Sequence, residues 1–394
     1  MLVAALAIVA VLFPSLVSGV TIPAPKPEGQ KHVVAHEHSY LVQTRRKDQY
    51  NPVVDRKLAI SLFILVLKEH CLSYCNDAYM LNKTSKVSNL QFFGNGSVGI
   101  FESFSFQSCC ASSALIETKG MKVVVLEPGA GTSRLLYTLL ARQLAALNVA
   151  VVTIDHPYDS PIVEFEDHIG AEAGESPALV EDTETETLDA FSIGTEWNET
   201  MFTALNTRRA DIHFVLDQMR EPSFLGKVFP KLQFTGSLNT TIAYMVSHGF
   251  GGTVASTMAV YDDRVVWSIN LSGTIFPIDK DTYDYTIFFG RVGFTRREDP
   301  NWLSSVKHFR GPFTEWTFAK AGLMDYTDLA LLESLSGTGV KAKGTGENGV
   351  WAFHCTSCFI EAYVRDTLQN DMGQLTKCLR MCPNMSPYQK LNRI

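Results

Sequence analysis

The chain has 394 residues and a formal net charge of −7 at pH 7. Hydrophobic residues make up 46% of it, which is ample for a buried core and excludes a disordered chain. The negative charge argues against nucleic acid as a partner and against electrostatic docking on anionic lipid.

The first 19 residues are almost wholly apolar, carry no charged side chain and end in the small residues Val17-Ser18-Gly19. This pattern predicts a signal peptide over residues 1–19. The alternative is an uncleaved membrane anchor, but Pro14 and the proline-rich residues 22–27 favour cleavage. No other segment is long enough to span a bilayer. We therefore expect a secreted, extracellular protein without a membrane span after cleavage.

Apolar runs and helical periodicity alternate through the middle of the chain. The pattern is typical of a parallel sheet with crossover helices, so we expect an α/β fold with a mainly parallel central sheet flanked by helices. The expected strands cover residues 58–67, 122–126, 149–154, 241–246, 265–271 and 285–292. Helical patterns cover residues 132–147, 207–219, stretches of 302–335, and 350–368, with a glycine-rich loop at 336–349.

An acidic segment at about residues 160–200 interrupts this alternation. No Lys or Arg occurs between Gln143 and Thr207, whereas Asp and Glu are frequent. We interpret it as a solvated surface loop rather than a binding element. Residues 20–394 then form a single domain with this loop as an insertion.

All eight cysteines lie beyond the predicted leader, in four closely spaced pairs. In a secreted chain an even number favours disulfides, but the sequence leaves their connectivity open. A zinc site that uses the C-terminal four cysteines with His354 is the less favoured alternative, because oxidising compartments promote bridges. The cysteines are Cys71, Cys75, Cys109, Cys110, Cys355, Cys358, Cys378 and Cys382.

Six Asn-x-Ser/Thr sequons occur in the chain. In a secreted protein such sequons in surface loops accept N-linked glycans. Asn270 follows an apolar strand and is expected to be buried, and Asn384 is disfavoured by Pro387 just after its sequon. The expected glycosylation sites are Asn82, Asn95, Asn198 and Asn239.

Residues 241–255 read TIAYMVSHGFGGTVA, a buried strand, a tight turn of small residues and a helix. This is the setting of the nucleophile elbow, G-x-S-x-G, in α/β-hydrolases. The turn forces its apex into a positive-φ conformation, so the residues two before and two after must be small. Ser247 and Gly251 meet that need, but the apex itself is Gly249, which has no side chain.

Several motifs together resemble the secreted, largely fungal branch of the platelet-activating factor acetylhydrolase family. The family's elbow G-H-S-[FI]-G-G is matched by SHGFGG at residues 247–252, its oxyanion loop by PGAG at 128–131, and its I-D-H-P motif at 154–157. Glu196-Trp197 and the Arg208…Asp211 spacing resemble its E-W and R-x-x-D elements. The resemblance extends from about His36 to about Leu375 and implies an α/β-hydrolase fold.

The resemblance also implies where a catalytic triad belongs. The family's acid lies in N-L-D-G, and residues 270–273 here read NLSG, with Ser272 at the acid position. Its histidine lies in a motif like H-x-D-F-S-D, and residues 323–328 read LMDYTD, with Leu323 at that position. The triad-equivalent residues are thus Gly249, Ser272 and Leu323. None of them has the side chain that its position needs, which is a nucleophile at 249, an acid at 272 and a base at 323. The oxyanion hole would be the backbone N–H groups of Phe250 and Ala130.

Acyl transfer in this fold needs a hydroxyl nucleophile, a histidine base and an orienting acid. We therefore interpret the chain as a pseudoenzyme that has lost ester hydrolysis and keeps an apolar lipid or acyl pocket. Its expected partner is a small acyl ester or phospholipid, and we expect no cofactor and no metal. The alternative is an active 1-alkyl-2-acetylglycerophosphocholine esterase, a phospholipase A2-type carboxylic ester hydrolase of lipid catabolism.

A displaced triad could in principle rescue activity. Ser247 lies two residues before the apex, where its side chain should point away, and His248 is a scaffold residue of the family. Asp325 and Asp328 are more simply explained as residues of a helix's first turn. We therefore do not expect rescue.

Overall fold

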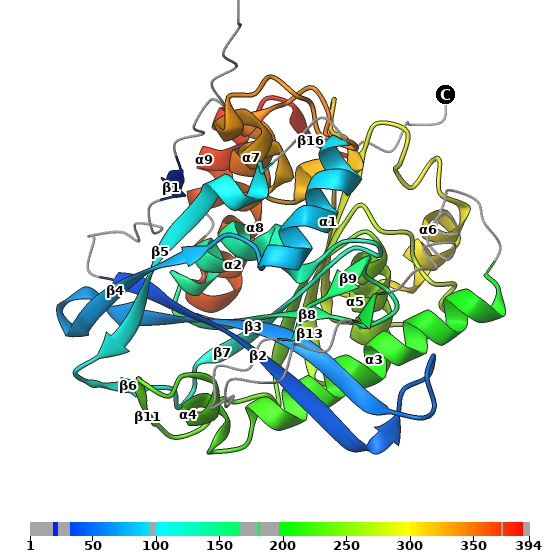
Figure 1. The fold of residues 1–394 in the computed structure, drawn as a ribbon. Coiled ribbons are helices and arrows are strands. Elements are labelled where there is room, and N and C mark those ends of the chain that lie inside the picture. The colour runs from blue at the N-terminus through cyan, green and yellow to red at the C-terminus, as the bar shows by residue number, and fades with distance from the viewer. Residues whose placement is uncertain are drawn as a thin grey trace, which may run out of the picture.

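The computed structural model describes residues 19–22, 32–94, 99–165, 180–181, 197–371 and 373–388. A nine-stranded sheet, in the order β16-β15-β14-β13-β12-β7-β8-β3-β2, forms its centre (Figure 1). Its strands are β2 (His32–Lys47), β3 (Asp55–Leu67), β7 (Lys122–Glu127), β8 (Val149–Asp155), β12 (Ala243–His248), β13 (Val265–Leu271), β14 (Tyr285–Arg291), β15 (Phe313–Phe318) and β16 (Met385–Pro387).

The six strands from β15 to β8 are parallel, whereas β3, β2 and β16 pair antiparallel at the two edges. Val246 of β12 pairs with Leu126 of β7 on one side and with Ile269 of β13 on the other. Because the strands run the same way, their carboxyl ends meet at one edge of the sheet. The expected α/β-hydrolase fold with a mainly parallel sheet is confirmed.

Helices cover both faces of the sheet, and the pleat of each strand divides the core between them. In β7, Val124 and Leu126 belong to one buried cluster, whereas Val123 and Val125 belong to the other. One face carries α1 (Asn82–Phe93), α2 (Thr138–Ala145), α7 (Leu329–Ser336), α8 (Val350–Gln369) and α9 (Gly373–Met381). The other carries α3 (Glu199–Met219), α4 (Phe224–Val228) and α5 (Phe250–Tyr261) (Figure 1).

The expected strands all form, and two of the expected helices differ from the structure. Helical stretches were expected within residues 302–335, and α7 is one of them, but Phe313–Phe318 in the same segment is the strand β15, which lies between β14 and β16. Five of the six residues of FTEWTF are aromatic or β-branched, which favours a strand, and pairing with β14 and β16 stabilises it. Helix α3 begins at Glu199, eight residues before Thr207, because the side chain of Asn198 accepts from Met201 N at 2.9 Å and caps it.

Further elements surround the sheet, and α6 covers a third buried cluster around Trp302. They are β1 (Val20–Ile22), β4 (Cys71–Ala78), β5 (Phe104–Ser112), β6 (Leu115–Glu117), β9 (Ile162–Val163), β10 (Val180–Glu181), β11 (Gln233–Thr235) and α6 (Pro300–Ser305). Within the described residues, no helix is both long and apolar enough to cross a membrane.

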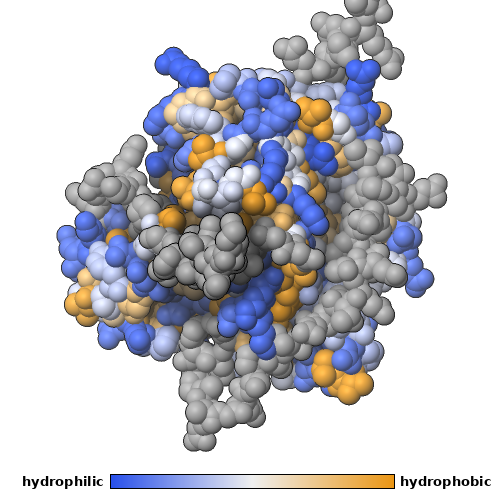
Figure 2. All heavy atoms as spheres, turned by 45° about the horizontal axis from the view of Figure 1, so that its top comes forward, coloured by the Kyte–Doolittle hydropathy of each residue, from blue (hydrophilic) through white to orange (hydrophobic). Residues whose placement is uncertain are grey.

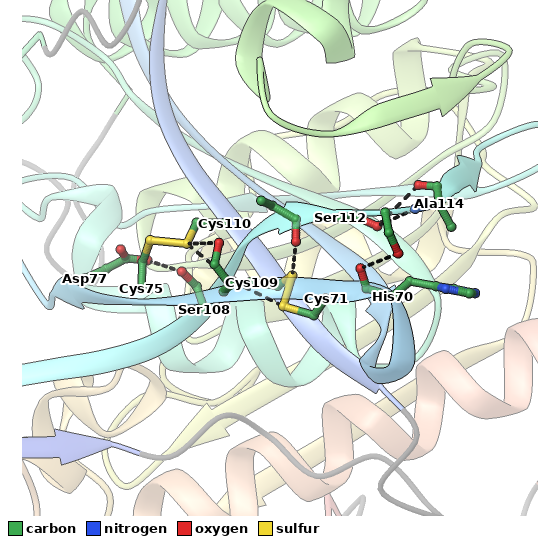
Figure 3. Close-up of a disulfide and its surroundings, with 12 residues drawn as sticks. His70, Cys71, Cys75, Asp77, Ser108, Cys109, Cys110, Ser112 and Ala114 are labelled. Atoms are coloured by element: carbon green, nitrogen blue, oxygen red, sulfur yellow. Dashed lines mark hydrogen bonds between the residues drawn. A yellow bond between two sulfur atoms is a disulfide. The ribbon is translucent and has the colours of Figure 1, made fainter.

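All eight cysteines are paired in four disulfides. Cys71–Cys109 and Cys75–Cys110 join the antiparallel strands β4 and β5, beside the hydrogen bond from Ser108 to Asp77 (Figure 3). Cys355–Cys382 and Cys358–Cys378 join α8 to the region of α9. The disulfide prediction is confirmed, and the zinc alternative is wrong because these sulfurs bond to each other.

Three predictions fall on parts of the chain outside the described residues. These are the leader up to Ser18, the sequon at Asn95 and most of the acidic segment, together with Glu196. Of the other sequons, Asn82, Asn198 and Asn239 are exposed, whereas Asn270 is buried as expected.

The face turned toward the viewer in Figure 2 mixes hydrophilic and hydrophobic residues, and the hydrophobic ones form small, separate patches. Large exposed apolar side chains come from distant parts of the chain, such as Val53, Leu72 and Tyr283. Apolar side chains scattered in this way are ordinary at protein surfaces. A candidate site is therefore better sought in concave places.

Candidate active site

The turn between β12 and α5 has the geometry of a nucleophile elbow. Gly249 joins the two elements with φ 52° and ψ −124°, in the left-handed range of φ that favours glycine. A Cβ at Gly249 would meet only Gly129 Cα, at an ordinary 3.5 Å, whereas a Cβ at Gly251 would lie 2.5 Å from the oxygen of Pro128. The turn is thus too tight for any side chain at Gly251, where the fold needs a small residue. At the apex, Gly249, there is room for a side chain, but glycine has none.

A cavity of about 140 Å³ opens beside this apex. It lies at the carboxyl ends of β7, β12 and β13, where folds of this class place their sites. Ala130, Gly249, Phe250, Ser272 and Leu323 all line it, so the structure brings the residues singled out from the sequence together. The full lining is Gly129, Ala130, Thr132, His248, Gly249, Phe250, Thr253, Ser272, Gly273, Thr274, Arg291, Phe294, Leu323 and Met324.

Ser272 follows β13 directly and has a positive φ of 62°. Asn270 closes this turn by accepting from Gly273 N at 2.7 Å. The Ser272 hydroxyl is buried and has no hydrogen-bond partner among the described residues. Asp and Asn tolerate positive φ better than Ser does, and buried hydroxyls are normally paired. This backbone therefore suits an acid better than the serine it carries.

Leu323 opens a short 3₁₀ helix (Leu323–Tyr326), and its apolar side chain is 38% exposed. Its main-chain oxygen accepts a hydrogen bond from His248 Nε2 at 2.9 Å. An exposed leucine at the rim of a cavity contributes no proton transfer. The backbone contact nevertheless ties this segment to the elbow.

Both ring nitrogens of His248 are engaged. Because a carbonyl can only accept, Nε2 carries the proton, and Nδ1 accepts from the hydroxyl of Tyr137 at 2.7 Å. Burial lowers the pKa of His248 to about 4, so the ring is neutral at physiological pH. His248 is therefore a fixed hydrogen-bond bridge and has no nitrogen available to act as a base.

Tyr137 also fixes the loop that resembles an oxyanion loop. Gly129 N donates to the Tyr137 hydroxyl at 3.0 Å, and Thr132 Oγ1 donates to Gly129 O at 2.6 Å. Gly131 N donates to Asp159 O at 2.9 Å. The loop that carries Ala130 is thus held rigidly beside Gly249.

No hydroxyl that lines the cavity contacts an imidazole within the described part of the chain. Thr132 donates to Gly129, Thr253 donates to Thr274 O, and the Thr274 side chain bonds the carboxylate of Asp299. Ser247 does not line the cavity, and its buried hydroxyl has no partner there. The geometry offers no paired nucleophile and base.

Three motif residues, His156, Arg208 and Asp211, belong to a buried ionic network beneath the site. Arg56 binds Asp48 at 2.7 Å and Asp211 at 2.6 Å, and Arg208 binds Glu127 at 2.9 Å. His156 lies between Asp211 and Glu127, at 2.7 and 2.8 Å. Burial alone would lower the pKa of His156, but the two carboxylates outweigh burial and raise it. These motifs are therefore scaffold.

Asp325 and Asp328 also serve as scaffold, but only Asp325 acts as expected. Asp325 lies in the first turn of the 3₁₀ helix and accepts from Gly322 N at 3.2 Å. Asp328 precedes α7 without capping it, and accepts instead from Leu139 N of α2 at 2.7 Å and from the Tyr79 hydroxyl at 2.8 Å. Burial raises the pKa of Asp328 to about 7.

A larger cavity lies elsewhere, at the amino ends of β7 and β8. It measures about 500 Å³ and is lined in part by His32, Met121 and Asn148. Within the described residues there is also no cluster of three or more potential metal ligands. The elbow cavity is therefore the one that combines strand ends, a helix start and the predicted site residues.

Comparison with known proteins agrees with this geometry. Residues 99–299 match the family described as platelet-activating factor acetylhydrolase, isoform II. The chain belongs to this family. A curated relative is the probable 1-alkyl-2-acetylglycerophosphocholine esterase of Arthroderma benhamiae, which is 25% identical over 262 residues. The match covers 64% of this chain and 59% of that relative.

A solved structure extends the comparison to the whole fold. A ferulic acid esterase from Streptomyces cinnamoneus superposes with a TM-score of 0.71 at 20% identity. The superposition covers 93% of this chain and 99% of the esterase. At this identity the likeness establishes the α/β-hydrolase fold of the acetylhydrolase-like chain.

Sequence reasoning missed two residues of the site. Tyr137 lies in a short 3₁₀ turn before α2, and the apolar spacing of that segment gave no sign that its hydroxyl reaches His248. Arg291 is the last residue of β14, and its side chain lines the cavity. Its place at the carboxyl end of an expected strand was the signal that could have found it.

Proposed function

We propose that this acetylhydrolase-like protein is a pseudoenzyme that binds a small acyl ligand without hydrolysing it. The observation that carries the proposal is the apex of the elbow. Gly249 has the positive φ of a nucleophile position, borders the cavity and has no side chain. Loss of a nucleophile in a triad enzyme costs on the order of 10⁶ in kcat.

The neighbouring residues support the same proposal. Ser272, with its unpaired hydroxyl, replaces the acid, and Leu323 replaces the base. His248 cannot substitute for that base, because both of its nitrogens are bonded within the scaffold. An oxyanion hole alone leaves only about 10³–10⁴ over the uncatalysed reaction.

Three further parts of the proposal concern ligand and compartment. The cavity suits one short acyl group rather than a whole phospholipid, since about 140 Å³ is below the usual range of about 300–1,000 Å³ for ligand pockets. Four disulfides favour an oxidising compartment, and with the apolar leader they support secretion. Three predicted glycosylation sites, Asn82, Asn198 and Asn239, are exposed, and N-linked glycans there would accord with secretion.

The second candidate is an active acetylglycerophosphocholine esterase, as the name of the curated relative states for that protein. The intact loop at Ala130 and the start of α5 at Phe250 favour it, because main-chain donors do not depend on the lost side chains. Because residue 249 is glycine, the nucleophile would in that case have to be the hydroxyl of another residue.

The deciding experiment combines covalent labelling by a fluorophosphonate with hydrolysis of an acetyl ester, both on the secreted protein. The pseudoenzyme predicts no label and no turnover above background. Labelling that disappears in Ser247→Ala would establish a displaced nucleophile and favour the esterase.

A further inference from the structure

Arg291 supplies an unpaired positive charge to the elbow cavity. Of the fourteen lining residues, it carries the one side chain that is charged at neutral pH, because His248 is neutral. Within the described residues the guanidinium makes no ion pair. Its carbon lies 5.1 Å from the ring centre of Phe294, and its buried Nε has no hydrogen-bond partner. A partly buried cation without a partner is costly, so its place in a cavity points to an anionic ligand.

Other donors line the same cavity. The hydroxyl of Ser272 is buried and unpaired, and the twelve-residue helix α5 begins beside the cavity at Phe250. The amino end of a helix favours negative charge. In the part of the chain that the structure describes, no acidic side chain lines the cavity. The carboxylate of Asp299, behind the lining residue Thr274, is already engaged by Thr274 and by the N–H groups of Asn301 and Trp302, with which it caps α6.

The rest of the lining is apolar and limits the size of the ligand. Phe250, Phe294, Leu323 and Met324 form the apolar part of the wall. A cavity of about 150 Å³ holds a molecule the size of benzene, and this one measures about 140 Å³. The ligand therefore combines one anionic group with a chain of a few carbons.

We infer that the cavity binds a short-chain carboxylate, with its carboxylate on Arg291 and Ser272 and its alkyl chain against Leu323 and Met324. Arginine binds a planar carboxylate through two parallel hydrogen bonds. Inorganic phosphate would leave the apolar wall without a contact, so the cavity favours the carboxylate. The inference rests on the proposed function in one respect, which is that the site binds without reacting.

The test measures the affinity of hexanoate and of its neutral analogue hexanamide by titration calorimetry on the secreted protein. We expect wild type to bind hexanoate at least about tenfold more tightly than hexanamide, the usual effect of a hydrogen bond to a charged group. Arg291→Gln should abolish this preference. The matched control Arg297→Gln, an exposed arginine that does not line the cavity, should keep it.

Several results would overturn the inference. These are no binding of hexanoate, equal affinity for acid and amide, an Arg291→Gln protein that matches Arg297→Gln, or phosphate binding as tight as hexanoate. Arg291→Lys keeps the charge but cannot form the two parallel hydrogen bonds, so it should bind hexanoate more weakly than wild type while still preferring it to hexanamide. If Arg291→Gln fails to fold, an Arg291→Lys protein with wild-type affinity for hexanoate would contradict the inference. Fluorophosphonate labelling of the same preparation tests the proposed function separately, so the two failures are distinguishable.

Discussion

His248 Nε2 lies 2.9 Å from the main-chain oxygen of Leu323 and donates a hydrogen bond to it. The residue that flanks the elbow apex thus holds in place the segment that begins with Leu323, the position matched to the family's histidine. With Tyr137 on the other nitrogen, this bridge links β12, the loop at Gly129 and the 3₁₀ helix at Leu323. The site keeps its architecture through contacts that use no part of a catalytic triad.

The bridge predicts a dependence of stability on pH. Burial lowers the pKa of His248 from its ordinary value of 6.5 to about 4. Between these values the unfolded chain binds a proton at this ring and the native protein does not, so stability rises with pH through this window. The stabilising contribution of His248 is therefore complete above about pH 6.5 and decreases by about 3 kcal/mol as the pH falls through 4.

Asp328 acts in the opposite direction, because burial raises its pKa to about 7. The comparison therefore uses the difference in unfolding free energy between wild type and His248→Gln, measured by urea denaturation. That difference should shrink by about 2–3 kcal/mol between pH 7.5 and pH 4.5. The variant of exposed His354→Gln serves as the matched control, and a His248 difference that stays flat would contradict a buried neutral ring.

The disulfides predict complete protection of the cysteines. Intact-mass measurement after alkylation without reductant should find no modified thiol among the eight. Replacing Cys355 and Cys382 together by Ser should destabilise the protein by about 3 kcal/mol, because the bridge closes a long loop. Eight reactive thiols in the purified protein would be incompatible with this pairing.

The buried ionic network predicts a large effect from a single charge. Asp211→Asn leaves Arg56 and His156 without their shared carboxylate and should cost about 3–5 kcal/mol of unfolding free energy. Asp217 lies on the same helix as Asp211, α3, and is an exposed partner of Arg264. Asp217→Asn should therefore change the free energy of unfolding by less than about 0.5 kcal/mol. Similar costs for the two variants, measured by thermal unfolding, would refute a scaffold role for the network.

The sequence predicted the centre of this fold better than its edges. The strands β7, β12 and β13 were recognisable because continuous apolar runs mark strands buried on both faces. The edge strand β2 and the antiparallel pair β4 and β5 were missed, since their mixed polar pattern reflects partial exposure. β15 was not expected, because helical patterns surround its six residues and its strand partners become neighbours only in the folded sheet.

The site shows the same division. The elbow at Gly249 could be predicted, because a turn with a positive φ imposes small residues at fixed spacing. The role of Tyr137 could not, because it comes from a contact with His248, 111 positions away. Arg291 was overlooked although it stands near the carboxyl end of an expected strand, because only the fold shows that its side chain lines the cavity. Asp328 shows where prediction from sequence ends. The sequence placed it in the first turn of a helix, but in the folded structure its carboxylate accepts a hydrogen bond from Leu139 N of another helix, α2.

The sequons give a prediction about secretion. Glycosidase treatment should remove mass at Asn82, Asn198 and Asn239, whose side chains are exposed. Asn270 should stay unmodified in the folded protein, because it is buried and bonds Gly273 O and the Ser256 hydroxyl. Peptide mapping checks each position, and a glycan on Asn270 would contradict the placement of this turn.

The central claim is that this scaffold is intact and that only its three reacting groups are lost. Gly249→Ser alone should stay inactive, since it has no base, and should lose about 1 kcal/mol of stability at its positive φ. The triple change Gly249→Ser, Ser272→Asp and Leu323→His rebuilds nucleophile, acid and base around one cavity. Its effects should be strongly non-additive, because such groups act as a unit.

The most direct test is the rate of hydrolysis of one acetyl ester by the unmodified protein, the Gly249→Ser variant and the triple variant. We expect background rates for the first two and measurable turnover for the third. Substantial turnover by the unmodified protein that Ser247→Ala abolishes would contradict the claim and make the chain an enzyme.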